Sequence, residues 1–164
     1  MIAIRVNDYR IMKPTPKGWP RLSASVFYDD PRAAIDWLCK AFDFEKRMVV
    51  EGDDGTIVHS ELMYGEGMVM VSGTGQSTKR NDYSAMYASP KSLGNKMTGA
   101  FCFFVDDCDA HHKHAVESGA KIVREPTTSD YGDDYWTDRS YGALDPEGHL
   151  WWFMQRIATG RERG

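Results

Sequence analysis

Two stretches of the chain show the same succession of apolar and polar positions. Residues 22–28 and 100–105 are rich in apolar side chains and predict strands, and two aspartates follow each of them. A helical spacing of apolar residues comes next in both copies. Because an aspartate at the end of a strand can accept hydrogen bonds from the free N–H groups of a first helical turn, these aspartates mark helix starts.

Three further strands are predicted after each helix. They cover residues 45–50, 57–64 and 68–72 in the first copy, and residues 121–125 followed by a C-terminal hairpin in the second. Asp145, Pro146 and Gly148 are the residue types that a tight turn needs at these positions, so the hairpin turns there. The predicted order is therefore βαβββ, twice.

This repeat divides the chain into five parts. We expect an N-terminal extension at residues 1–19, a first unit at 20–72, a linker or lid at 73–98, a second unit at 99–157 and a tail at 158–164. The linker is rich in Gly, Ser, Thr, Asn and Lys. Connections of that length are uncommon unless they are functional or mobile.

The overall composition is that of an ordinary soluble domain. Hydrophobic residues make up 41% and charged residues 27% of the 164 positions, and the net charge is −4. The charge and the lack of a basic cluster argue against a nucleic-acid partner, and no apolar run is long enough for a membrane span. Without a signal-peptide pattern, we expect a cytoplasmic protein whose three cysteines are free thiols.

The second unit carries sequence motifs of a known family. Residues 145–151 read Asp-Pro-Glu-Gly-His-Leu-Trp, residues 89–94 read Ser-Pro-Lys-Ser-Leu-Gly, and residues 131–133 read Tyr-Gly-Asp. With the duplicated βαβββ order, the chain resembles the vicinal oxygen chelate superfamily, also called the glyoxalase and bleomycin-resistance family, over residues 20–157. The resemblance implies an α+β fold of two paired βαβββ units forming a half-open, cup-shaped mixed β-sheet. It also implies a homodimer.

Enzymes of that family hold a divalent metal with His and Glu side chains, two from each unit. The matching positions here are Ser23, Phe101 and Trp152, with a fourth near Val71. None of these side chains binds a divalent metal in that way. The resemblance therefore predicts neither a metal nor another cofactor for this chain.

An aromatic-lined cavity remains. The last strand is apolar on both faces, which suits a strand between a helix layer and a concave cavity, although plain core packing on both faces is an equal alternative. An acidic stretch at residues 130–138 could attract a cationic aromatic ligand, or could be an ordinary exposed hairpin in which Arg139 pairs with one Asp. The candidate ligand-binding residues are Ser23, Ser25, Phe101, Phe103, Trp136, Tyr141, Trp152 and Met154.

Two histidine patterns offer other chemistry. His59 and Glu61 are two apart on a predicted strand, so they share a face and could act as an acid–base pair, although an outward, solvated pair is the stronger interpretation. His111, His112 and His114 lie early in the second predicted helix, where we expect a solvated surface rather than a metal site.

Three functions are compatible with these patterns. The leading hypothesis is metal-free binding of a small molecule, with sequestration of an antibiotic as its concrete form. The second is a lyase, isomerase or dioxygenase that uses a displaced metal site or the His59 and Glu61 pair. The third is a regulatory or structural protein whose groove binds a peptide or is closed by its own lid.

Overall fold

The structure, a computed structural model, describes residues 13–75 and 85–160. Most of the predicted N-terminal extension and tail, and residues 76–84 of the predicted lid, lie outside the described residues. The first unit consists of β1 (Ser23–Tyr28), α1 (Pro31–Phe42), β2 (Glu45–Glu51), β3 (Ile57–Tyr64) and β4 (Gly67–Gly73). The second consists of β5 (Ala100–Phe104), α2 (Cys108–Glu117), β6 (Lys121–Asp130), β7 (Trp136–Leu144) and β8 (Leu150–Thr159).

Each unit forms one four-stranded mixed sheet, sheet A in the first and sheet B in the second. The strand order is β1-β4-β3-β2 in sheet A and β5-β8-β7-β6 in sheet B. The first strand of each unit runs parallel to the last, while the other neighbours are antiparallel. A short 3₁₀ helix, η2 (Pro90–Leu93), lies in the segment between the units.

The two helices begin where the sequence predicts. The Asp30 side chain accepts from the backbone N–H of Ala33, and the Asp107 side chain accepts from that of Ala110. Both bonds satisfy N–H groups that have no partner inside a helix. Each helix is thereby fixed to the strand that precedes it, and in α1 the apolar stripe from Ala34 to Phe42 is buried.

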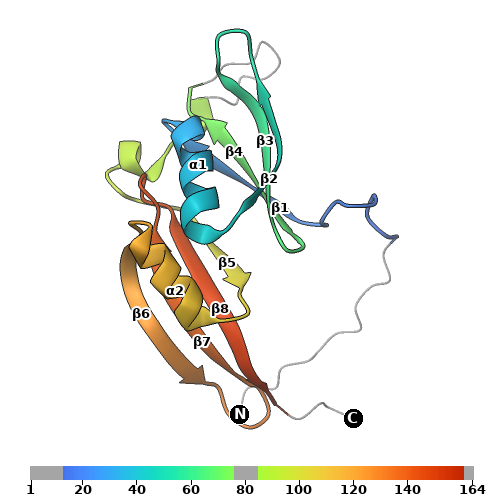
Figure 1. Cartoon of the computed structure of the whole chain (residues 1–164), viewed down its shortest axis with the longest axis vertical. Coiled ribbons are helices and arrows are strands. Elements are labelled where there is room, and N and C mark those ends of the chain that lie inside the picture. Colours follow the sequence, from blue (N-terminus) through green and yellow to red (C-terminus); the bar gives the residue numbers. More distant parts are fainter. Residues whose placement is uncertain (1–12, 76–84, 161–164) are drawn as a thin grey trace.

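One hydrophobic core joins the two units. Phe42, at the end of α1, contacts Trp151 and Phe153 of β8, and Phe44 packs edge-on against Phe103 of β5. The units lie one above the other along the long axis, and α1 and α2 meet at the middle (Figure 1). The face of each sheet that points away from this core is not covered by a helix.

The predicted α+β fold of two βαβββ units is confirmed, with two mixed sheets and two helices. The three cysteines are free thiols, as expected. Within residues 13–75 and 85–160, no helix has both the length and the apolar character that crossing a membrane requires.

Candidate functional site

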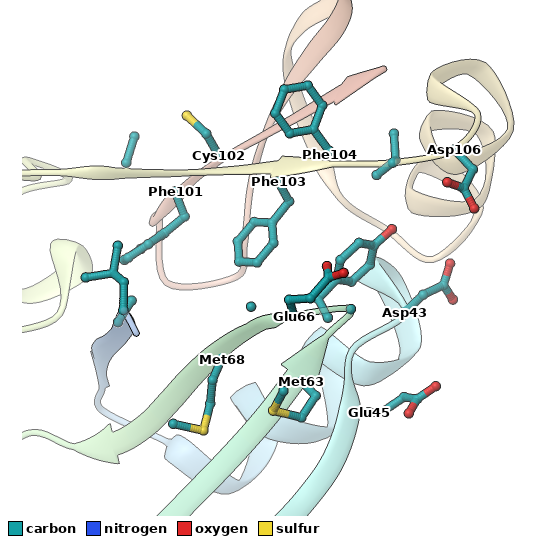
Figure 2. Close-up of a pocket in the computed structure, with 17 residues that line it drawn as sticks. Asp43, Glu45, Met63, Glu66, Met68, Phe101, Cys102, Phe103, Phe104 and Asp106 are labelled. Atoms are coloured by element: carbon teal, nitrogen blue, oxygen red, sulfur yellow. The ribbon is translucent and has the colours of Figure 1, made fainter. Parts of the chain in front are cut away.

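A groove of about 910 Å³ lies between β5 and the end of the β3–β4 hairpin. The alternation of β5 points Phe101 and Phe103 toward the hairpin, whereas Cys102 and Phe104 point the other way (Figure 2). Leu22, Ala24 and the hairpin residues Met63 and Met68 complete an apolar wall. Apolar walls with a few polar groups are typical of small-molecule sites.

Carboxylates supply the charge of this groove. Asp43, Glu45, Glu66 and Asp106 line it, and its described lining contains no Lys, Arg or His. Burial raises the pKa of the Tyr64 hydroxyl, and the nearby charges of Asp43 and Asp106 raise it further. The groove therefore offers a negative potential beside aromatic rings, which favours a cationic ligand with an apolar body.

The second candidate site is the His59 and Glu61 pair on sheet A. It lies on the face of the sheet that points away from α1, which we call the open face. On β3, Ser60 and Leu62 are buried with the core strands, so His59 and Glu61 share the open face. His59 Nε2 lies 3.0 Å from Glu61 Oε1, and Arg47 Nε lies 3.4 Å from Glu61 Oε2. The sequence predicted an outward, solvated pair, and this prediction is wrong for Glu61, whose side chain is only 2% exposed.

Aromatic and cationic side chains share the corresponding open face of sheet B. A Cβ atom on Gly142 would lie 2.8 Å from the Trp152 ring, so the indole rests directly on the glycine. The guanidinium of Arg124 lies 5.8 Å from the centre of that ring. Arg156 pairs with Asp138 and lies over both Phe104 and Trp136. These contacts form an aromatic surface flanked by two arginines, Arg124 and Arg156, of which Arg156 is paired with Asp138.

The structure does not bring the predicted ligand-binding residues together on one wall. In the parallel register of β5 and β8, Phe101 pairs with Trp151 and Phe103 with Phe153, so both phenylalanines lie on the core side of sheet B. The remaining members lie elsewhere: Trp152, Met154 and Trp136 on the open side of sheet B, and Ser23 and Ser25 on the open side of sheet A.

Two sequence-based expectations are wrong. Tyr141 does not line the groove beside β5, because its side chain is buried in the core and its hydroxyl lies 2.6 Å from Nδ1 of His111. His111 is itself buried rather than solvated, because α2 packs it between the two units. In addition, Arg139 pairs with Asp109 of α2 instead of an aspartate of its own hairpin.

The positions that hold the metal in the resembling family do not fit one here. Val71 is buried in the core, Phe101 packs on Trp151, and Ser23 and Trp152 offer only a hydroxyl and an indole. Within the described part of the chain, no group of three or more His, Cys, Asp and Glu side chains is placed to hold a metal ion. Divalent metals in proteins need such donors.

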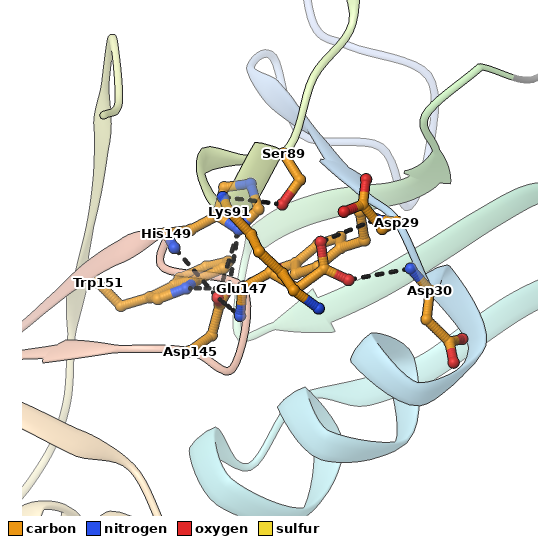
Figure 3. A network of polar contacts seen from close by, with 9 residues as sticks. Asp29, Asp30, Ser89, Lys91, Asp145, Glu147, His149 and Trp151 are labelled. Atoms are coloured by element: carbon orange, nitrogen blue, oxygen red, sulfur yellow. Dashed lines mark hydrogen bonds and ion pairs between the residues drawn. The ribbon is translucent and has the colours of Figure 1, made fainter. Parts of the chain in front are cut away.

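The Asp-Pro-Glu-Gly-His-Leu-Trp motif builds a buried polar junction between the units (Figure 3). The Asp145 carboxylate accepts from the Tyr28 hydroxyl at 2.6 Å and from Trp151 Nε1 at 3.0 Å. Glu147 accepts from the backbone N–H groups of Asp29 and Asp30. This motif therefore attaches the turn of the second unit to the β1–α1 junction of the first, which is a structural role.

Sequence reasoning missed the acidic groove. Its four carboxylates come from three separate places along the chain, so no local pattern identifies them. One partial signal was available, because Asp43 and Asp106 each come at the end of a predicted element, the first helix and the first strand of the second unit. The Gly65-Glu66-Gly67 turn brings the third carboxylate to the same place.

Comparisons with known proteins agree with this architecture. Residues 22–153 match the model of the Glyoxalase/Bleomycin resistance protein/Dioxygenase superfamily. The uncharacterized protein Mb0911c of Mycobacterium bovis is 32% identical over 142 residues, which cover 84% of each chain. The uncharacterized protein Rv0887c of Mycobacterium tuberculosis has the same identity, over 84% of this chain and 75% of its own.

Two solved structures show the same fold. TioX from Micromonospora sp. ML1 is 30% identical, with a TM-score of 0.62, and the match covers 83% of this chain and 98% of TioX. A glyoxalase/bleomycin resistance protein/dioxygenase family enzyme from Burkholderia phytofirmans PsJN is 16% identical, with a TM-score of 0.57, over 82% and 97% of the two chains. The chain belongs to the Glyoxalase/Bleomycin resistance protein/Dioxygenase superfamily.

Proposed function

We propose that this protein binds a small molecule stoichiometrically, without a metal, and that the ligand combines a flat aromatic part with a positive charge. The observation that carries the proposal is the groove beside β5, which is lined both by the rings of Phe101 and Phe103 and by four carboxylates. Aromatic rings bury large areas and stack on flat ligands. A cation beside them gains from the negative potential of the rim.

Sequestration of an antibiotic is the concrete form of this function. Binding removes the free drug, so no bond has to be broken and no acid, base or metal has to act. Glu45, Glu66 and Asp106 have no ion-pair partner among the described residues, which leaves their charges available to a ligand. Asp43 is shared with His114, whose Nε2 lies 3.3 Å away.

Calorimetric titration with proflavine, a planar aromatic cation, tests the proposal. We expect saturable binding in the groove near one molecule per chain, weakened about tenfold or more at low salt by the combined changes Glu45→Gln, Glu66→Gln and Asp106→Asn.

The matched control neutralises three exposed carboxylates outside both the groove and the acidic stretch, with Asp53→Asn, Glu117→Gln and Glu125→Gln. It should leave the affinity within about twofold, because distant charges are screened by salt. Absence of saturable binding, or equal losses in the two triple variants, would reject the groove as the site.

We also propose that the protein is a homodimer. The open faces of the sheets expose large apolar side chains, among them Met48 and Val50 on β2, which pair with Glu61 and His59, and Phe104 on sheet B. Apolar surface of this kind is typical of interaction sites. Light scattering coupled to gel filtration should give twice the mass of the 18.6 kDa chain, and a monomer at micromolar concentration would contradict the assignment.

A second candidate function is acid–base catalysis by the His59 and Glu61 pair. The 3.0 Å contact and the burial of Glu61 favour it, because a buried carboxylate can orient an imidazole for proton transfer. Under this hypothesis, His59→Ala and Glu61→Gln each abolish turnover of a substrate while proflavine still binds the groove. Turnover that survives both changes would exclude the pair.

A further inference from the structure

The open face of sheet A carries a row of residues that runs from an aromatic ring to a histidine. Val26 and Tyr28 are buried on the core side of β1, so Phe27 lies on the open side together with its register partner Ser72 of β4. His59 of β3 is on the same side. Because β4 lies between β1 and β3, the two ends of the row are about 10 Å apart.

The chain itself places a flat ring at the first end of this row. Tyr87 stacks on Phe27 with ring centres 3.9 Å apart and planes only 8° from parallel. Phe27 belongs to a paired strand, whereas Tyr87 belongs to a loop segment and is 40% exposed beside Met86, which is more exposed still. The Phe27 ring is thus a fixed platform, and Tyr87 is the ring that can leave it.

A buried carboxylate sets the chemistry of the second end. Glu61 is 2% exposed, and its Oε2 atom has no hydrogen-bond partner among the described residues although Arg47 Nε lies at 3.4 Å. Its Oε1 atom accepts from Nε2 of His59 when that nitrogen carries the proton. In the neutral imidazole Nδ1 then has no proton and can accept a hydrogen bond from a ligand.

We propose that this row binds a planar, polycyclic aromatic ligand that carries an exocyclic amino N–H donor on one edge. The rings replace Tyr87 on Phe27, and the donor reaches Nδ1 of the histidine whose orientation Glu61 fixes. The inference goes beyond the proposed function, because it assigns a second binding site on the open face of sheet A, and it rests on that function only in that both sites take a small aromatic ligand. Its residues are separate from the carboxylates and phenylalanines of the groove, so the two can fail independently.

Two dyes of the same shape test the row. Both dyes carry the protonated ring N–H of the acridinium cation. Only proflavine also carries exocyclic amino N–H groups, because in acridine orange those hydrogens are replaced by methyl groups. We expect Tyr87→Ala to tighten binding of both dyes about two- to tenfold, because a competing stack is removed, and Phe27→Ala to weaken binding of both by a similar factor. His59→Leu should weaken proflavine and leave acridine orange unchanged.

Tyr131→Ala is the matched control, because Tyr131 is an exposed tyrosine that packs on Trp136 of sheet B. It should leave both affinities unchanged. Weaker binding in Tyr87→Ala, or His59→Leu acting equally on the two dyes, overturns the inference.

The same titrations separate this inference from the proposed function. Binding that responds to the groove carboxylates and is indifferent to Phe27, Tyr87 and His59 overturns the row and leaves the proposed function intact. If neither the natural chain nor Tyr87→Ala binds either dye, the row and the proposed function are both rejected.

Discussion

At the scale of single residues, Asp145 is a buried carboxylate that accepts several hydrogen bonds. Burial by itself would raise the pKa of its carboxyl, but hydrogen bonds from His149, Tyr28 and Trp151 and the charge of His149 hold the pKa below its ordinary value. The same contacts stabilise the charged carboxylate at the place where the two units meet. The motif by which the sequence resembles its family therefore has a structural role in joining the two units.

Replacement of this carboxylate should be costly. Asp145→Asn removes a charge that accepts from several donors and places an amide N–H₂ among them, so we expect a loss of about 3 kcal/mol in the free energy of unfolding. Urea denaturation followed by circular dichroism measures it. Asp134→Asn, at an exposed position, should change stability by less than about 0.5 kcal/mol. Equal effects of the two changes would show that the junction does not stabilise the fold.

At the scale of elements, the β7–β8 pair depends on one glycine. Gly142 is the register partner of Trp152, and a Cβ atom there would lie within 2.8 Å of the indole ring. Gly142→Ala should displace the ring and destabilise the protein by about 1 to 3 kcal/mol. The loss should be much smaller when the same change is made in a Trp152→Leu background. Losses that simply add would mean that the strain lies elsewhere in the strand.

The same strands show which features could be predicted from the sequence and which could not. The order of elements, the helix starts and the tight turn at Asp145 were predictable because each depends on neighbouring residues. Strand β6 extends to Asp130, beyond the predicted end at residue 125, because its pairing shifts register around Pro126 and the apolar alternation is interrupted. Which face of sheet B bears Phe101 depends on its register with β8, and no local pattern encodes that.

At the scale of the whole molecule, a buried histidine lies between the two units. His111 of α2 packs on Phe42 of the first unit and on Phe153 of the second, and its Nδ1 contacts the Tyr141 hydroxyl. Burial lowers the pKa of its imidazole below the ordinary 6.5, although the Phe42 carbonyl and Asp43 oppose that shift. We therefore expect the free energy of unfolding to depend on pH through this residue.

The direction of this coupling follows from the two states. Below about pH 6.5 the unfolded chain protonates His111, while the folded chain keeps it neutral until a lower pH. Stability from this residue is thus complete above pH 6.5 and is lost as the pH falls, by about 1.4 kcal/mol for each pH unit in which only the unfolded state is protonated. In urea denaturation from pH 7.5 to 5.5, His111→Asn should start less stable and decline less steeply than the natural chain. Parallel curves would place the acid sensitivity on other groups and leave His111 as a packing residue alone.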